Sequence, residues 1–410
     1  MKSGKPRLAF VSPLFLFPND AGGKIRTTNI LRGLHGGVFD VTLISPATTQ
    51  QTSDWASELQ GVCDRFVGWQ PSPAKPRWQR ALHLLGELPV NVASDCMPQA
   101  IATVRDTLVC GDFDVAVFDF VHAAVLMPEQ FKGARVCFTH NVEAEIFERH
   151  AATTRGTLMQ PVWSSQSRKM RRFERDSLRR FDRVVAVSDR DAKHFRENYD
   201  LRSTSVIPTG VDLDFFSWHA PPAIGAGDAP TIVFTGSMDW AANVGGVEFF
   251  VDYVLPLVVE RLPQARLVVV GRNPPAALVE RTRTRPVTFT GFVDDVRSYV
   301  GAAHAFVIPL RVGSGTRIKA FEAMSMGCPI VSTTIGIEGL DVTPAEHYLR
   351  ADTAPELADA LVRLLLDAQL RLDLSRRARD RVEQKFGHRV AAAAFEAICS
   401  GALRNDFYDK

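Results

Sequence analysis

Two series of short apolar runs, each alternating with longer amphipathic stretches, make up this sequence of 410 residues. The runs are apolar along their whole length instead of at every second position, which is typical of strands buried on both faces of a parallel sheet. Strands that alternate with helices in this way build doubly wound α/β domains. Because 410 residues are too many for one ordinary core, the sequence predicts two such domains of similar size.

The two series are separated by Ala220–Pro230, which is rich in Pro, Gly and Ala and has the composition of a linker. The strands predicted before it are Arg7–Ser12, Val38–Ser45, Val115–Asp119, Ala134–Thr139, Arg183–Val187 and Thr204–Ile207, with helical patterns at Lys24–Leu34 and Ser167–Arg180. The strands predicted after it are Thr231–Gly236, Ala265–Gly271, Val287–Gly291, Ala305–Pro309 and Pro329–Ser332. The helices predicted among these are Gly245–Arg261, Pro274–Thr282, Val296–Ala303 and Thr316–Met326, and the chain is helical again from Ala354.

Charge and cysteine usage argue against several classes of protein. A formal net charge of +2 gives no field strong enough to indicate nucleic-acid binding. The six cysteines form neither CxxC pairs nor zinc-ligand spacings, which favours free thiols in a reducing cytoplasm. The best approach to a membrane span, Val115–Met127, contains Asp119 and His122. We therefore expect a cytoplasmic protein that is soluble or, as an open alternative, peripheral at the inner face of the membrane.

The window from Pro309 to Gly327 carries the clearest chemical signal. A predicted strand leads through a Gly-Ser-Gly turn, which contains Ser314 and Gly315, and Thr316 then enters a helix. Such a turn lets the backbone approach a ligand closely, and the free N–H groups and the dipole of the helix start favour an anion. Arg317 and Lys319 add enough positive charge for a diphosphate, and Glu322 can accept both hydroxyls of a ribose. The alternative is an ordinary amphipathic helix with solvated charges.

This window and seven other segments together resemble glycosyltransferase family 4, over nearly the whole chain. The matching segments are Pro18–Thr27, Thr139–Glu143, Val184–Ser188, Ile207–Asp212, Val233–Trp240, Val270–Pro274 and Thr290–Asp295. The resemblance implies the GT-B fold, in which two Rossmann-like domains face a central cleft. It also implies retaining transfer of a hexose-type sugar from a nucleotide-sugar to a glycan or lipid-linked acceptor in surface polysaccharide synthesis. We accordingly expect an acceptor-binding domain at 1–205, a donor-binding domain at 206–385, and a C-terminal helix at 386–410 that returns to the first domain.

Two positions depart from the family pattern. Glu322 matches the second glutamate of the family's Glu-x7-Glu motif, which holds the donor ribose, but Ser314 occupies the place of the first glutamate, which contacts the donor sugar. Ser237 stands where many members have an arginine for the diphosphate, and the usual lysine after Trp240 is also missing. We hypothesise that Arg317 and Lys319 have taken over the diphosphate.

The resemblance assigns roles to further residues, each of which has a structural alternative. His140 is expected to face the donor sugar and to be catalytic together with Arg317 and Lys319, although it could simply cap a loop. The expected donor-binding residues are Gly22, Gly23, Gly236, Ser314, Gly315, Thr316, Glu322 and Glu338, of which Glu338 could only fix a turn. The expected acceptor-binding residues are Lys24, Arg26 and Glu143, which could also be surface charges or a helix start.

No metal or other cofactor is expected, because cationic side chains and helix-end amides can stabilise the leaving diphosphate. The nearest approximations to a metal motif are Asp294-Asp295 and Asp112-Phe-Asp114, and neither is a convincing ligand set. Two alternatives to transfer remain open on the same fold: a non-catalytic nucleotide-sugar-binding protein and a nucleotide-sugar epimerase. A Rossmann oxidoreductase is disfavoured because no GxGxxG follows the first strand.

Two stretches are candidates for contact with a membrane surface. Ser167–Arg180 carries seven basic residues on one predicted helix, which would suit anionic lipid headgroups. Glu174 and Asp176 interrupt that charge and favour a solvated helix with ion pairs. Lys75–Gly86 places a tryptophan beside three leucines.

Overall fold

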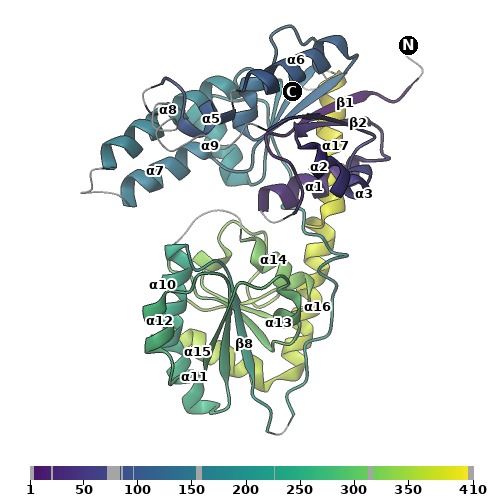
Figure 1. The fold of residues 1–410 in the computed structure, drawn as a ribbon. Coiled ribbons are helices and arrows are strands. Elements are labelled where there is room, and N and C mark those ends of the chain that lie inside the picture. The colour runs from purple at the N-terminus through teal and green to yellow at the C-terminus, as the bar shows by residue number, and fades with distance from the viewer. Residues whose placement is uncertain are drawn as a thin grey trace. The chain divides into compact units, whose positions relative to one another are not determined.

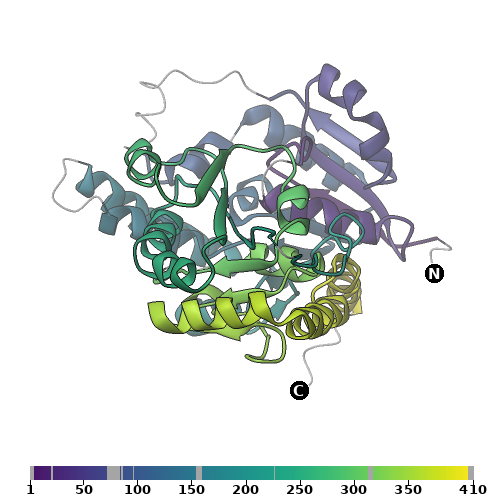
Figure 2. The same cartoon turned by 90° about the horizontal axis from the view of Figure 1, so that it is seen from below.

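The computed structural model describes residues 4–19, 22–71, 84, 86–95, 97–153, 159–225, 227–312 and 317–404. The chain forms two compact units, Met1–Gly210 together with His388–Lys410, and Val211–Gly387. Each unit contains one parallel sheet covered by helices, as Figures 1 and 2 show. The predicted class, two doubly wound α/β domains, is therefore confirmed.

The first unit is built on a seven-stranded sheet in the order β3-β2-β1-β4-β5-β6-β7. Its strands are β1 (Arg7–Val11), β2 (Asp40–Pro46), β3 (Arg65–Trp69), β4 (Val115–Asp119), β5 (Ala134–Phe138), β6 (Arg183–Ala186) and β7 (Thr204–Val206). β1 and β4 lie beside each other at the centre, and their residues are almost all buried. The sequence analysis missed β3, because this edge strand is only partly buried and lacks a continuous apolar run.

Helices cover both faces of this sheet. They are α1 (Gly22–Leu34), α2 (Thr49–Asp54), α3 (Ala56–Gln60), α5 (Val90–Asp95), α6 (Pro98–Cys110), the 3-10 helix η2 (Val121–Leu126), α7 (Glu143–Thr153), α8 (Gln160–Leu178), α9 (Asp189–Tyr199) and α17 (His388–Arg404). The C-terminal helix α17 packs against α1, β5 and β4. Phe395 of α17 contacts Phe10 and Phe138 edge-on or tilted, so the end of the chain completes the core of the first unit.

The second unit has a six-stranded sheet in the order β10-β9-β8-β11-β12-β13. Its strands are β8 (Thr231–Thr235), β9 (Arg266–Val270), β10 (Val287–Gly291), β11 (Ala305–Ile308), β12 (Ile330–Ser332) and β13 (Leu349–Arg350), of which only the two-residue β13 was not predicted. Its helices are α10 (Ala241–Phe249), η3 (Phe250–Val254), α11 (Leu255–Arg261), α12 (Ala276–Arg281), α13 (Arg297–Gly301), α14 (Ile318–Ser325), η4 (Ile335–Ile337), α15 (Ala354–Leu366) and α16 (Ala368–Lys385). Phe234 of β8 faces the core under η3, α11 and α15, and the neighbouring Val233 faces the core under α14 and α16.

The units are joined at Gly210 and Gly387, where the chain passes from one to the other. The Val211 N–H donates to the Phe386 carbonyl oxygen at 2.8 Å, so the two chain segments leave the second unit side by side. The first boundary, at Gly210, lies five residues beyond the expected position 205, and the second, at Gly387, lies two residues beyond the expected position 385. The segment Ala220–Pro230 belongs to the second unit and is not the boundary, because it leads directly into the central strand β8.

One helical stretch, Ala241–Arg261, is long and apolar enough to pass a test for a membrane span by length and composition. It comprises α10, η3 and α11, and half of the tested window is buried inside the protein. Phe250, Val254 and Val258 are fully buried in the core of the second unit. Glu248 and Asp252 lie in the same stretch. This pattern is that of a core helix.

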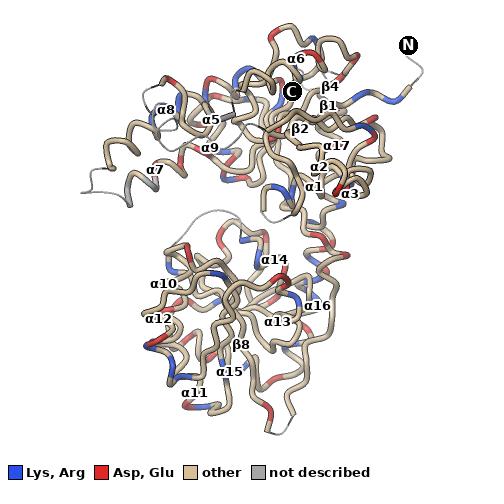
Figure 3. Tube along the Cα trace, in the orientation of Figure 1, with Lys and Arg blue, Asp and Glu red and all other residues tan. Residues whose placement is uncertain are grey.

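The charged residues of both units are interspersed in sign, as Figure 3 shows. On α8, two of the basic residues considered for contact with lipid form ion pairs: Arg171 pairs with Glu148 of α7, and Arg175 pairs with Asp176 at 2.8 Å. Lys169 donates to the carbonyl oxygen of Leu84 at 2.7 Å. These contacts favour the solvated, paired helix over a membrane-binding face. Most of the other candidate stretch, Lys75–Gly86, lies outside the described residues.

Close packing where β8 and β9 end leads to a stability prediction. A Cβ atom on Gly271 would overlap the carbonyl oxygen of Gly236, and backbone cannot move aside cheaply. Gly271→Ala should therefore lower the free energy of unfolding by about 1–3 kcal/mol. Gly245→Ala is the matched control, since a Cβ there meets nothing within 4 Å and alanine improves the helix by about 0.5–1 kcal/mol. Thermal and urea unfolding measure both, and equal midpoints for the two variants would contradict the packing argument.

Candidate functional site

A buried polar cluster lies at the carboxyl ends of the central strands of the first unit. Its centre is Asp119, the last residue of β4, whose side chain has no exposed surface. The Asp119 carboxylate accepts hydrogen bonds from Ser12 at 3.1 Å, from Thr27 at 3.0 Å and from His140 at 2.7 Å. These donors come from the loop after β1, from α1 and from the loop after β5. The sequence analysis noticed Asp119 only as an interruption of an apolar run, although a carboxylate that ends a buried strand is itself a signal of a site.

The neighbours of His140 define its protonation state. Because Nε2 lies 2.7 Å from a carboxylate oxygen of Asp119, we assign the proton to Nε2. Nδ1 then accepts a hydrogen bond from Arg26 at 3.3 Å. Burial lowers the pKa of His140, and the charge of Asp119 opposes this only in part. His140 is thus a neutral imidazole with both ring nitrogens engaged, an arrangement better suited to orienting a ligand than to transferring a proton.

Phe120 connects this cluster to the predicted glycine pair. It follows Asp119 with a φ of 62°, a conformation that costs energy for a residue with a Cβ. Its ring stacks on the His140 ring, with centroids 4.0 Å apart and planes 23° apart. A Cβ on Gly23 would lie 2.6 Å from the tip of the Phe120 ring, so glycine is needed for this contact. Gly22 begins α1 at the same place, and the glycine loop is therefore held against His140 through Phe120.

The two predicted acceptor-binding cations are placed differently. Arg26 is buried, with 7% of its surface exposed, and its Nε has no hydrogen-bond partner among the residues that the structure describes. Burial lowers the pKa of Arg26 to about 10, and the nearby charges of Asp191 and Asp119 limit the shift. Lys24 lies at the edge of the cluster, where its ammonium donates to the Pro18 carbonyl oxygen at 3.3 Å.

Glu143 begins α7, and its carboxylate lies 3.5 Å from His122 Nε2. His122 in turn stacks parallel to Phe120, so Glu143 belongs to the periphery of the same cluster. Its position is fixed by Glu174 of α8, which sequence reasoning considered only as an interruption of a basic run. The buried Glu174 carboxylate accepts hydrogen bonds from the backbone N–H groups of Glu143 at 2.8 Å and Ala144 at 3.2 Å, and from the Tyr199 hydroxyl at 2.8 Å.

A second cluster lies in the second unit, at the carboxyl end of β8 and the start of α14. Lys319 donates to the Thr235 carbonyl oxygen at 2.9 Å and to the side-chain oxygen of Asn243 at 3.0 Å. Its ammonium also lies 4.1 Å from the centre of the Phe234 ring, a favourable cation–π distance. Burial, reinforced by the nearby charge of Arg317, lowers the pKa of Lys319 to about 7. No described carboxylate pairs directly with this ammonium group.

Arg317 and Glu322 flank Lys319 on the same helix. Arg317 caps the start of α14 and is 3% exposed, with its guanidinium carbon 5.7 Å from the centre of the Trp240 ring. Glu322 makes no side-chain hydrogen bond or ion pair with any described residue. Burial raises its pKa to about 7, against the opposing charge of Lys319. The start of α14 thus brings together the buried Arg317 and the partly buried Lys319 and Glu322.

The other residues predicted to bind the donor differ in whether, and where, the structure places them. Ser314, Gly315 and Thr316 lie outside the described residues. Gly236 adjoins Lys319, with a φ of 155°, and a Cβ there would lie 2.8 Å from Asn243 and 3.1 Å from the Lys319 ammonium. Glu338 is exposed at the turn that ends η4. The structure therefore brings Gly236, Arg317, Lys319 and Glu322 together.

Ser237 has neighbours that sequence reasoning missed. Its hydroxyl donates to Asp239 at 2.9 Å and accepts from Arg272, in the loop after β9, at 3.3 Å. Asp239 also accepts from Arg272 at 3.1 Å and from Asn273 at 2.9 Å. A guanidinium therefore lies beside the position where the expected arginine is missing, and it comes from the loop that follows β9.

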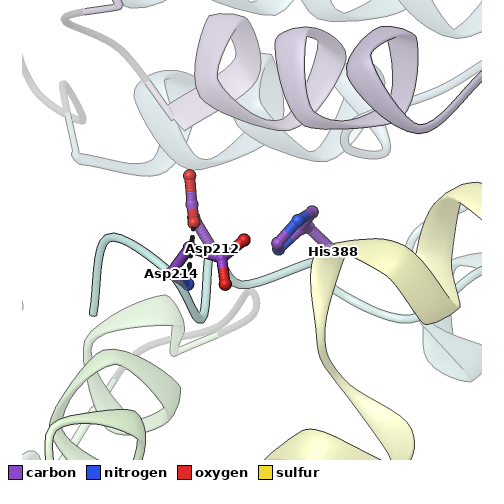
Figure 4. Close-up of side chains that lie close together, drawn as sticks. All are labelled: Asp212, Asp214 and His388. Atoms are coloured by element: carbon purple, nitrogen blue, oxygen red, sulfur yellow. Dashed lines mark hydrogen bonds between the residues drawn. The ribbon is translucent and has the colours of Figure 1, made fainter. Parts of the chain in front are cut away.

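Two of the acidic residues considered for metal binding, Asp114 and Asp295, have other partners. Asp295 pairs with Arg297 through both carboxylate oxygens, which lowers the Asp295 pKa. Asp114 accepts a hydrogen bond from the Arg7 N–H at 2.8 Å. Figure 4 shows a further group, Asp212, Asp214 and His388, in which Asp212 accepts from the Asp214 N–H at 3.1 Å. His388 belongs to the first unit and the aspartates to the second, so we treat the aspartates as a turn and not as part of a metal site.

Comparison with known proteins identifies the family. The profile described as "Glycosyltransferase Family 4" matches residues 21–215, and the profile described as "Glycosyl transferases group 1" matches residues 229–367. Together the two matches span most of the chain. The chain belongs to the family 4-like glycosyltransferases. The resemblance recognised in the sequence is thereby confirmed.

Curated relatives and solved structures agree with this assignment. The chain is 25% identical to the lipopolysaccharide core biosynthesis mannosyltransferase LpsB of Rhizobium meliloti, over 59% of this chain and 72% of that protein. It is 30% identical to a phosphatidyl-myo-inositol mannosyltransferase of Mycolicibacterium smegmatis, over 54% of this chain and 61% of that protein. Sucrose-phosphate synthase from Thermosynechococcus elongatus matches 98% of this chain and 99% of its own, with a TM-score of 0.66 and 19% identity. The fold of this glycosyltransferase is therefore GT-B.

The buried Glu174 carboxyl group, which accepts hydrogen bonds at the start of α7, predicts that the stability of the wild type relative to Glu174→Gln depends on pH. Burial raises the pKa of Glu174 to about 7, so the folded protein binds a proton more readily than the unfolded chain. The stability contributed by this proton is fully present below the ordinary pKa of 4.5 and is lost as the pH rises to about 7. The unfolding free energy of the wild type relative to Glu174→Gln should therefore fall by up to about 3 kcal/mol across this range. Urea denaturation from pH 4.5 to 7.5 measures it, and a rising difference would contradict the assignment.

Proposed function

We propose that this glycosyltransferase moves a hexose-type sugar from a nucleoside-diphosphate sugar to a glycan or lipid-linked acceptor, with retention of the anomeric configuration. The observation that carries the proposal is the start of α14. Arg317 is buried there beside the partly buried Lys319. Glu322, which is also partly buried, bonds to no described side chain. A desolvated ammonium group without a described carboxylate partner is costly, and the negative charge of a nucleotide diphosphate would compensate it.

The division of labour on α14 follows from chemistry and position. A departing nucleoside diphosphate gains negative charge as the glycosidic bond breaks, so fixed positive groups stabilise the transition state more than the ground state. Arg317 and Lys319 supply this charge, and the N-terminal amides of α14 add to it. Glu322 accepts hydrogen bonds from the ribose hydroxyls. With these cations in place, we propose that the reaction needs no metal ion.

Known proteins suggest which donors to try first. Two relatives are named as mannosyltransferases above, and a third, from Xanthomonas campestris, is named as using GDP-mannose and is 25% identical over 55% of this chain and 60% of that protein. The solved structure of Anabaena HepE, which matches 96% of this chain with a TM-score of 0.64 and 15% identity, contains UDP-glucose. We therefore propose GDP-mannose as the first candidate donor and UDP-glucose as the second.

The first unit is proposed to bind the acceptor and to orient the donor sugar. The His140 ring, held by Asp119 and Arg26, offers a fixed neutral group at the carboxyl end of the sheet. Arg26, whose guanidinium contacts His140, supplies positive charge for an anionic group of the acceptor. Relatives named for lipopolysaccharide, phosphatidylinositol and diphosphopolyprenol substrates suggest a lipid-linked acceptor in surface polysaccharide synthesis. Such an acceptor would place the enzyme at the inner face of the cytoplasmic membrane.

Donor binding gives the most direct test. A nucleotide-sugar present at about 100 times its Kd should stabilise the protein by roughly 2.7 kcal/mol, seen as a raised melting temperature. We expect GDP-mannose or UDP-glucose to give the largest shift in a panel, and Glu322→Gln to weaken binding of that donor about tenfold or more. A protein that is stabilised but never releases nucleoside diphosphate with any glycolipid acceptor would be a binding protein. One that alters the donor sugar without an acceptor would be an epimerase.

The lowered pKa of Lys319 predicts how nucleotide binding depends on pH. A diphosphate binds the ammonium form, so above pH 7 binding requires uptake of a proton, and affinity should fall by up to about tenfold per pH unit. Lys319→Met should bind GDP and UDP about 10–100-fold more weakly at pH 6.5 and lose this dependence. Isothermal titration calorimetry from pH 6 to 9 measures both.

Two controls separate this effect from others. Glu322 ionises over the same range, so the series is repeated in a Glu322→Gln background, where Lys319 is the one of these two groups that still titrates. Arg363→Ala removes an exposed cation from α15 and should leave the affinity unchanged. A Lys319→Met variant with wild-type affinity would show that Lys319 does not contact the diphosphate.

A further inference from the structure

A cavity of about 300 Å³ lies in the first unit, apart from the polar cluster around Asp119. It is formed by the loops that follow the neighbouring strands β1, β2 and β3, together with η2 and the residue that precedes α6. The described residues lining it include no charged side chain. Those that matter below are Leu14, Phe15, Gln51, Trp69, Met97 and Leu126.

Two of these loops also build the polar cluster. Leu14 and Phe15 follow Ser12, whose hydroxyl donates to Asp119. Leu126 ends η2, the 3-10 helix that begins directly after Phe120, and Phe120 stacks on His140. The cavity is therefore lined by residues that are close in sequence to Ser12 and Phe120, two residues of the polar cluster. Like His140, the cavity lies at the carboxyl ends of the strands of this parallel sheet.

The walls of the cavity are packed before any ligand binds. Phe15 contacts Phe17 and Phe66 edge-to-face, with ring centroids 6.0 and 6.4 Å apart. Trp69 and Leu126 are 4% and 2% exposed, and both belong to the core of the unit. Leu14, by contrast, is 45% exposed. The cavity is thus a preformed apolar pocket with Leu14 at its rim, and a volume near 300 Å³ is at the lower end for small-ligand sites.

Gln51 provides the single carboxamide of the lining. Its side-chain oxygen accepts a hydrogen bond from the Thr48 N–H at 3.0 Å, as part of the box that caps α2. The amide group is therefore held in one orientation. Its nitrogen donates to no residue that the structure describes, so it is available to a ligand oxygen at the wall of an otherwise apolar pocket.

We propose that this cavity binds a hydrocarbon segment of the acceptor, adjacent to the sugar or headgroup that carries the accepting hydroxyl. Gln51 donates a hydrogen bond to an oxygen where the two parts of the acceptor join. The inference rests on the proposed function and narrows it: the acceptor is a lipid-type molecule with an uncharged apolar chain, and a free saccharide uses only the polar cluster. Such a chain requires apolar walls, and the described residues that line the cavity carry no charge.

Binding of n-alkyl glucosides tests the proposal without requiring transfer. Methyl, butyl, hexyl and octyl glucosides are titrated into the wild-type protein by calorimetry, below their critical micelle concentrations. Each methylene that enters the cavity should raise the affinity up to about fourfold, and the gain should end when the cavity is full. An affinity that is independent of chain length would overturn the proposal.

Variants locate the effect. Leu14→Trp fills the rim and should weaken octyl glucoside binding at least tenfold while leaving methyl glucoside unchanged. Val38→Trp is the matched control, since Val38 is 47% exposed and lies just before β2, at the opposite end of the strands. Met97→Ala enlarges the cavity and should move the end of the affinity gain to a longer chain. Equal losses in Leu14→Trp and Val38→Trp would also overturn the proposal.

The outcome is distinguishable from failure of the proposed function. Nucleotide-sugar binding is assigned to the second unit, so the melting-temperature shift with the donor should be the same in wild type, Leu14→Trp and Val38→Trp. A wild type that binds octyl glucoside at the cavity but no nucleotide-sugar contradicts the proposed function. A wild type that binds nucleotide-sugar but shows no dependence on chain length contradicts the hydrocarbon site alone.

Discussion

The hydrogen bonds to Asp119 organise the first unit. A carboxylate with no exposed surface is expensive to bury unless donors surround it. Ser12, Thr27 and His140 provide those donors from three separate loops or helices, so satisfying one buried group fixes the ends of β1, β4 and β5 relative to α1. The His140 tautomer, and the strained backbone of Phe120 that stacks on it, depend on the same interaction.

In the second unit, the desolvated side chains Lys319 and Glu322 are not hydrogen-bonded to any described group of opposite charge. Lys319 is held by a carbonyl oxygen, an amide oxygen and an aromatic ring, none of which carries a charge, and Glu322 has no side-chain partner among the described residues. Burial therefore moves the pKa values of both groups to about 7. A binding site that leaves charge uncompensated costs stability, and the cost is recovered when a ligand of opposite charge binds. In the polar cluster of the first unit, in contrast, Asp119 and His140 already have hydrogen-bond partners within the protein.

The sequence could predict features that leave a pattern within a few neighbouring residues, but not contacts between residues that lie far apart in the sequence. Continuous apolar runs predicted eleven of the strands to within one or two residues, because burial on both faces leaves a local trace. The edge strand Arg65–Trp69 and the short Leu349–Arg350 left no such trace. The proximity of Arg317, Lys319 and Glu322 was predictable because all three lie within six consecutive residues at the start of one helix. Glu174 and Arg272 were not, since each acts on residues more than 30 positions away.

One departure from the family pattern, Ser237, can be reconsidered on this basis. The lost arginine at Ser237 does not leave its surroundings without positive charge, because Arg272 approaches from the loop after β9, although its guanidinium is already tied to Asp239. Lys319 has no such tie to a carboxylate, and its ammonium is already desolvated, so an incoming phosphate gains more from it than from an exposed, paired arginine. Electrostatic reasoning therefore ranks Lys319 above Arg272 as the group that responds to the diphosphate.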